Sequence, residues 1–185
     1  MFGYGSLIWN PEFEHDQSVP GRLHGYHRAF CIGSVHYRGT PEAPGVVLGL
    51  DRGGSCAGVA FHLREARRRE SLERLYAREM LGGVYRPVVA TVTLRDARQV
   101  RALAFVADRA CRDYLRLDEA EILRRLRACA GSRGRNRDYA LETWRALGNH
   151  GIRDGRLARL CRSLMSDASE DPPRQPPVDP PLPIR

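Results

Sequence analysis

Residues 72–86 read Leu72-Glu73-Arg74-Leu75-Tyr76-Ala77-Arg78-Glu79-Met80-Leu81-Gly82-Gly83-Val84-Tyr85-Arg86. At about 100° per residue, the first part of this stretch forms a helix with one apolar stripe, made by Leu72, Leu75, Tyr76 and Met80. Gly82 and Gly83 end the helix, and Val84 opens an apolar run that is typical of a strand. The stretch therefore joins a helix to a strand through a glycine pair.

Glu79 lies inside the apolar stripe of this helix, whereas Arg78 is expected on a flank that water reaches. A carboxylate that faces a core loses solvation, and this loss favours its protonated form. Such a group is suited to general acid/base work near neutral pH. The residues alone leave a second interpretation open, in which Glu79 is a structural carboxylate paired with one of the many arginines.

Length and composition indicate one globular domain. A chain of 185 residues can bury a proper core, and it contains no apolar run of about 18 residues that would span a membrane. The N-terminus lacks the basic start and apolar stretch of a signal peptide. The five cysteines are widely spaced and form no CxxC pair. We therefore expect a cytoplasmic protein with neither a disulfide framework nor a metal site.

All 30 basic residues are arginines, and the chain has no lysine. P-loop, Schiff-base and Ser-x-x-Lys chemistries are therefore excluded. The net charge of +8 suggests nucleic-acid binding, but the arginines are spread along the chain and interleaved with acids. We expect no specific nucleic-acid function. A non-catalytic, arginine-rich binding module remains the alternative from a different class.

The N-terminal segment contains two glycines on either side of Tyr4. Gly3-x-Gly5 is not a dinucleotide fingerprint, because Ile8 replaces the third glycine and only two residues precede Gly3. Ser6 lacks the Gly-x-Ser-x-Gly elbow of hydrolases. Glycines here allow backbone N–H groups to approach a carboxylate or carbonyl oxygen. An ordinary tight turn after an edge strand is the other interpretation.

The remaining pattern predicts strands followed by helices, an α+β arrangement. Strands are expected at residues 21–35, 46–50, 57–63, 84–94 and 100–107, with a turn at 51–54 and a loop at 36–45 that carries Arg38. The later helices are expected to begin at three capping residues, Asp118, Asn136 and Asp154.

The composition changes near residue 166. Residues 166–185 hold seven of the twelve prolines, which predicts a disordered, polyproline-prone tail. The predicted domain therefore covers residues 1–165.

Four segments, in order, resemble the ChaC branch of the γ-glutamylcyclotransferases. They are Phe2-Gly3-Tyr4-Gly5-Ser6-Leu7-Ile8-Trp9, Arg38-Gly39-Thr40-Pro41, Arg78-Glu79 to Tyr85, and Gly134-Arg135-Asn136-Arg137-Asp138-Tyr139. The resemblance extends from residue 2 to about residue 165. It implies an α+β fold with surrounding helices and a small mixed barrel-like sheet.

The resemblance also implies a reaction and a site. The family releases 5-oxoproline from γ-glutamyl peptides, and in the ChaC branch the substrate is glutathione and the second product is Cys-Gly. The catalytic glutamate of the family corresponds to Glu79. The substrate loop corresponds to Phe2, Gly3, Tyr4, Gly5, Ser6 and Leu7, and Tyr85 and Tyr139 occupy positions near the pocket.

The resemblance further implies a small-molecule substrate and no cofactor. We expect a monomer that binds no membrane. The same resemblance leaves open a substrate alternative, other γ-glutamyl amines or dipeptides. Glu70 lies about half a turn from the Glu79 face and is not assigned to the site.

Overall fold

The computed structural model describes residues 1–166, so the predicted tail lies outside the described residues except for Ser166. In chain order the elements are β1 (Phe2–Gly3), η1 (Ser6–Ile8), β2 (His15–Ser34), β3 (Gly45–Leu63), η2 (Glu65–Arg67), α1 (Arg68–Glu79), η3 (Leu81–Gly83), β4 (Tyr85–Leu94), β5 (Gln99–Ala107), α2 (Glu119–Ala128), β6 (Ala130–Gly131), β7 (Gly134–Arg135), α3 (Asn136–Asn149) and α4 (Gly155–Ser166).

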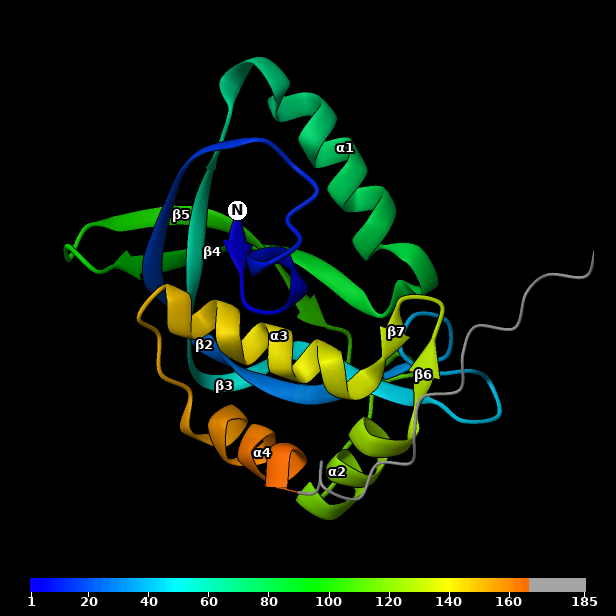
Figure 1. Ribbon diagram of the computed structural model, residues 1–185. Helices are drawn as coiled ribbons and strands as arrows, with labels where there is room; N and C mark the ends of the chain where they lie inside the picture. Colours follow the sequence, from blue (N-terminus) through cyan, green and yellow to red (C-terminus); the bar gives the residue numbers. More distant parts are fainter. Residues whose placement is uncertain (167–185) are drawn as a thin grey trace, which may run out of the picture.

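The main sheet has the strand order β1-β3-β2-β4-β5, and every pairing in it is antiparallel (Figure 1). Its longest pairing joins β2 and β3, from His15 opposite Leu63 to Ser34 opposite Gly45. The predicted α+β class is confirmed. The prediction of a mixed, barrel-like sheet is wrong, since in residues 1–166 the main sheet is antiparallel and no strand pairing closes it into a barrel.

β3 is one strand where the sequence predicted two. The expected turn at 51–54 is an irregularity inside the strand, where Gly53 and Gly54 have φ values of 98° and 68°. The register passes from His24–Ser55 to Tyr26–Arg52, with Gly25 at φ 87° on the opposite strand. At this point β3 has two residues, Gly53 and Gly54, opposite the single residue Gly25 of β2. This bulge changes which face of the sheet the following side chains of β2 occupy, so Leu23 before it and Arg28 after it are both buried.

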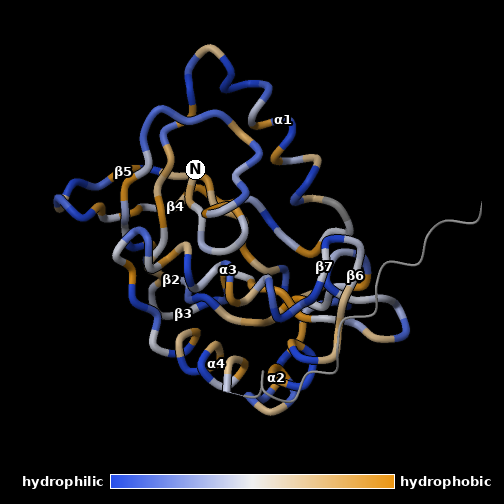
Figure 2. Tube along the Cα trace, in the orientation of Figure 1, coloured by the Kyte–Doolittle hydropathy of each residue, from blue (hydrophilic) through white to orange (hydrophobic). Residues whose placement is uncertain are grey.

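The core lies between the sheet and α2, α3 and α4. Figure 1 shows these helices gathered beside β2 and β3, with α1 set apart from them. Figure 2 shows hydrophobic segments along the strands and a largely hydrophilic trace along α1. The fully buried side chains of this core include Phe2, Leu23, Leu50, Ile122, Leu147 and Leu160.

α1 is held by fewer apolar contacts than its sequence predicted. Leu75 is 2% exposed and packs with Leu7 and Phe105 in a small separate cluster. Tyr76 and Met80 are 40% and 39% exposed, so the expected stripe is buried only in part. No helix within residues 1–166 has the length and apolar character needed to cross a membrane.

Two of the three predicted helix caps are confirmed. Asp118 Oδ1 accepts from Glu121 N at 2.8 Å, and Asp154 Oδ1 accepts from Leu157 N at 3.0 Å. The prediction that Asn136 caps a helix is wrong.

Asn136 lies inside α3 and is fully buried against β3. Its Oδ1 accepts from Val46 N at 2.7 Å and its Nδ2 donates to Val46 O at 2.8 Å. A side-chain amide has the same donor and acceptor as a peptide group, so Asn136 satisfies both polar groups of Val46.

We expect Asn136→Ala to lower the free energy of unfolding by about 2–4 kcal/mol, because it leaves the buried N–H and C=O of Val46 without partners. Urea denaturation followed by circular dichroism measures this loss. Asn149→Ala, at the exposed end of the same helix, is the control and should change stability by less than about 0.5 kcal/mol. Equal losses in the two variants would contradict the role of Asn136.

Candidate functional site

The N-terminal turn is fixed by bonds from distant strands. Phe2 and Gly3 pair with Ala60 and Val59 of β3, and the turn closes with a bond from Ile8 N to Gly5 O at 3.0 Å. The Tyr4 hydroxyl donates to Phe105 O at 2.9 Å. These bonds hold the glycine segment against the sheet as it leaves β1.

Arg28 binds this turn from inside the protein. Its guanidinium donates from Nε to Tyr4 O at 2.7 Å, from Nη2 to Ala57 O at 2.6 Å, and from Nη1 to Asp154 Oδ2 at 2.5 Å. The Arg28 side chain is 4% exposed. A buried charge is tolerated when it is paired and hydrogen-bonded, and here each of the three guanidinium nitrogens has a partner.

Glu79 is the last residue of α1, and its side chain is 13% exposed. The chain then leaves the helix through Gly82 and Gly83, whose φ values of 78° and 67° favour glycine. Because the chain turns away directly after the helix, the Glu79 carboxylate is left at the wall of a cavity.

Arg78 connects Glu79 to the N-terminal turn. It donates from Nη2 to Ser6 Oγ at 2.8 Å and from Nη1 to Asn10 O at 3.1 Å. Its Nε lies 3.1 Å from Glu79 Oε1, and its Nη1 lies 3.2 Å from Glu12 Oε1. Arg78 was expected where water reaches it, but its side chain is only 12% exposed because the turn covers that flank.

The pKa of Glu79 is raised above its usual 4.5. Burial is the main cause, and it is opposed by the positive charges of Arg78 and Arg133 and reinforced by Glu12. The carboxyl group therefore exchanges its proton closer to neutral pH than an exposed glutamate does.

Two phenol hydroxyls near Glu79 bind the main chain of Leu48. The Tyr85 hydroxyl donates to Leu48 O at 2.9 Å, and the Tyr139 hydroxyl accepts from Leu48 N at 3.1 Å. Burial raises the pKa of Tyr139 to about 12 and that of Tyr85 well above its ordinary value, so both stay protonated at neutral pH. The Tyr139 proton has no acceptor within residues 1–166, which leaves it able to donate to a ligand.

These groups meet at a cavity of about 780 Å³. Of the residues assigned to the site from sequence, four line it: Ser6, Glu79, Tyr85 and Tyr139. The other five do not, namely Phe2, Gly3, Tyr4, Gly5 and Leu7.

The predicted residues that do not line the cavity support the fold around it. Phe2 is fully buried in the core, and Leu7 packs against Leu75 and Phe105. A Cβ at Gly5 would lie 3.2 Å from the Tyr139 oxygen, so glycine at this position admits the phenol. The side chains of Phe2 and Leu7 therefore belong to the protein interior.

Arg38 is a cavity residue that the sequence indicated only weakly. It is 7% exposed, and its guanidinium carbon lies 5.9 Å and 5.5 Å from the ring centres of Trp9 and Tyr139. Its Nη1 donates to Arg135 O at 3.1 Å. The sequence shows an arginine in a loop beside Gly39. It does not show that Trp9 and Tyr139 lie next to this arginine, because both are far from it in the chain.

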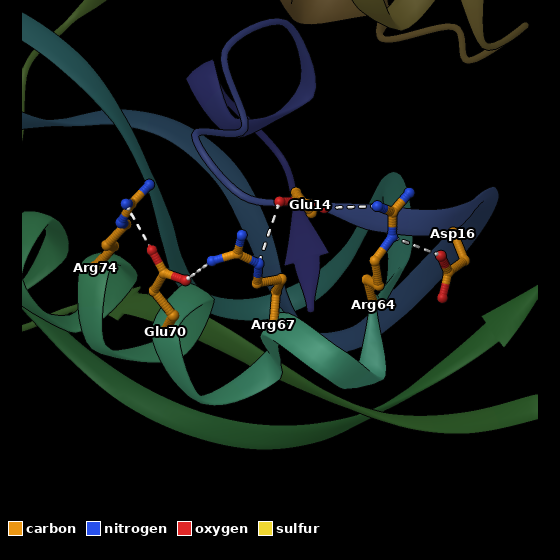
Figure 3. A network of polar contacts seen from close by, with 6 residues as sticks. All are labelled: Glu14, Asp16, Arg64, Arg67, Glu70 and Arg74. Atoms are coloured by element: carbon orange, nitrogen blue, oxygen red, sulfur yellow. Dashed lines mark hydrogen bonds and ion pairs between the residues drawn. The ribbon is translucent and has the colours of Figure 1, made fainter.

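Glu70 lies outside the cavity, in an exposed network of ion pairs (Figure 3). It accepts from Arg67 and Arg74, each at 2.7 Å, while Arg67 and Arg64 reach Glu14. This network joins the start of α1 to the neighbouring strands. Residues 1–166 contain no group of three or more His, Cys, Asp or Glu side chains that could hold a metal ion.

Comparisons with known proteins agree with the resemblance found in the sequence. The family described as "ChaC-like protein" matches residues 1–166. The glutathione-specific γ-glutamylcyclotransferase of Escherichia coli is 37% identical over 94% of this chain and 75% of its own length. The mouse glutathione-specific γ-glutamylcyclotransferase 1 is 36% identical over 76% of this chain and 66% of its own.

The fold is shared with a solved structure. A yeast γ-glutamyl cyclotransferase specific to glutathione superimposes with a TM-score of 0.82 at 20% identity, covering 89% of this chain and 94% of the yeast chain. At that identity the match supports the fold alone.

The raised pKa of Glu79 predicts a pH-dependent contribution to stability. A carboxyl that binds its proton more tightly when folded stabilises the protein fully below its unfolded pKa of about 4.5, and this contribution is lost as pH rises through the folded value. Relative to Glu79→Gln, the wild type should therefore lose stability between about pH 4 and neutrality. Urea titrations of both proteins across this range measure it.

Glu70→Gln is the matched control with the opposite sign. Hydrogen bonding to Arg67 lowers the pKa of Glu70, so its contribution is present above pH 4.5 and is lost as pH falls. Parallel trends for the two variants would contradict the raised pKa of Glu79.

Proposed function

Since this chain belongs to the ChaC-like family, we propose that it is a glutathione-specific γ-glutamylcyclotransferase, a lyase that cleaves glutathione to 5-oxoproline and Cys-Gly. The observation that carries the proposal is the position of Glu79. This carboxyl is shielded from water, has a raised pKa, and lines one cavity with Ser6, Tyr85 and Tyr139.

The reaction is an intramolecular substitution at the γ-carbonyl. The α-amine of the glutamyl group attacks this carbon, and the new C–N bond closes a five-membered lactam. The old γ-amide C–N bond then breaks and releases the amine of Cys-Gly. Holding the glutamyl chain folded back can supply an effective molarity of about 10⁵ M or more.

Glu79 acts as general base and then as general acid. It removes a proton from the attacking amine and returns that proton to the leaving nitrogen, so the two transfers balance. One carboxyl can perform both steps when its pKa lies near the working pH. Arg78 positions the carboxylate by holding its Oε1 beside Ser6.

The N-terminal turn supplies donors for the substrate's oxygens. The amides of Gly5, Ser6 and Leu7 donate no hydrogen bond within residues 1–166. Of these, the Ser6 amide belongs to the cavity lining, and with Ser6 Oγ and the Tyr139 phenol it is the proposed donor to the glutamyl carboxylate or the developing oxyanion, an effect worth about 3 kcal/mol per donor. Tyr85, whose proton is donated to Leu48 O, is proposed to contact the substrate as part of the cavity wall. Phe2, Gly3 and Tyr4 hold the turn in place.

The remaining expectations concern the setting of the enzyme. We infer that it works as a monomer in the cytoplasm, without a nucleic-acid partner. All five cysteines are free thiols, four of them buried, which suits a reducing compartment.

We expect Glu79→Gln to keep the fold and to lower 5-oxoproline release from glutathione by at least about 10²-fold, because general acid/base catalysis is lost. Chromatographic assay of 5-oxoproline with purified protein measures it, with Glu70→Gln as the control that retains turnover. Turnover close to wild type in the Glu79 variant would end the assignment.

The substrate alternative is tested in the same assay. Glutathione, γ-glutamyl-alanine and γ-glutamyl-lysine are compared side by side, and a preference for either of the last two would favour the broader activity. Salt-dependent nucleic-acid binding without turnover of any γ-glutamyl compound would favour the arginine-rich binding module.

A further inference from the structure

Glutathione carries two carboxylates, and the proposed mechanism accounts for one end of the molecule only. With the glutamyl part at Glu79 and the N-terminal turn, the leaving Cys-Gly extends about 7 Å along the cavity before its own carboxylate. A cation on the remaining lining is the natural partner for this second carboxylate. The cavity offers four arginines: Arg38, Arg78, Arg112 and Arg133.

Three of these arginines are poorly placed for the role. Arg78 already bonds Ser6 and Asn10 and pairs with two glutamates. Arg38 is enclosed between two aromatic rings and bonds Arg135 O. Arg112 has a side chain that is 89% exposed, and a carboxylate there stays in high-dielectric solvent.

Arg133 is oriented but has unused hydrogen-bond donors. Its guanidinium carbon lies 4.2 Å from the ring centre of Tyr37, which sets the plane of the group. The nearest carboxylate oxygen, on Glu12, is 3.7 Å from Nη1, which is longer than a hydrogen bond. No acceptor in residues 1–166 forms a hydrogen bond with its guanidinium, and its side chain lines the cavity and is 41% exposed.

The main chain beneath Arg133 is rigidly held. Ser132 donates from both N and Oγ to His36 O at 2.9 Å, and Arg133 N donates to Tyr37 O at 3.0 Å. A Cβ at Gly131 would come within 2.6 Å of the Tyr37 carbonyl carbon, so glycine permits this close approach. The β6–β7 hairpin thus presents Arg133 at a fixed place on the rim.

We propose that Arg133 binds the C-terminal carboxylate of the leaving dipeptide and thereby selects γ-glutamyl peptides over uncharged γ-glutamyl amines. A guanidinium with two free parallel donors matches a carboxylate. Arg133 also acts electrostatically on Glu79, which agrees with both groups facing one substrate. The inference rests on the proposed cyclotransferase activity and names what sets its selectivity.

The test pairs one substitution in the protein with one in the substrate. KM and kcat are measured for glutathione and for its C-terminal amide, with wild type, Arg133→Gln and Arg112→Gln. For wild type we expect KM to be about tenfold higher for the amide, with kcat little changed. In Arg133→Gln the KM for glutathione should rise to that of the amide, while KM for the amide changes by less than about twofold.

Each outcome decides the assignment. Arg112→Gln should keep the wild-type ratio between the two substrates, because its charge is in solvent. A ratio that persists in Arg133→Gln, or a wild-type ratio near one, would overturn the role of Arg133 while leaving the cyclotransferase activity intact. Absence of 5-oxoproline from both substrates with wild type would instead overturn the proposed function and, with it, this assignment.

Discussion

The buried guanidinium of Arg28 is the interaction on which the arrangement of the site depends. It joins three parts of the chain: the carbonyl of Tyr4 in the N-terminal turn, Ala57 in β3, and Asp154 at the start of α4. The Arg28 side chain is only 4% exposed, so the cost of burying its charge is offset only when all three partners are in place. Asp154 also caps α4, and α4 and the glycine turn are therefore both held by Arg28.

From this anchor the polar groups of the cavity form a continuous chain. The turn fixed by Arg28 presents Ser6 to Arg78, and Arg78 in turn holds Glu79. On the other side, the Tyr85 and Tyr139 hydroxyls meet at Leu48. The Glu79 carboxyl is thus oriented by Arg78, while its burial raises its pKa. A titratable group in a cavity whose pKa is shifted by burial is a candidate functional residue.

Local features of this fold could be predicted from sequence, and features that depend on distant partners could not. The helix before Gly82 and the caps at Asp118 and Asp154 rest on contacts within a few residues, and their prediction is confirmed. The continuity of β3 could not be predicted, because β2 pairs across a turn-like Gly53-Gly54 segment and keeps the strand intact.

The same reason explains the errors at Asn136 and Arg78. Asn136 reads as a cap, but its partner Val46 is 90 residues away. Arg78 reads as a solvated flank, but a turn 72 residues earlier covers it. Glu79 could be proposed from sequence because its own helix places it on an apolar stripe, although much of that stripe is exposed.

The main chain and the side chain of Leu48 have separate roles beside the cavity. Both phenols are positioned by main-chain atoms of residue 48, whereas its side chain is 3% exposed within the core. Exchange of one aliphatic group for another at this position would alter interior packing but leave the hydroxyls where they are. Thermal robustness and turnover can therefore evolve independently at a residue that borders both.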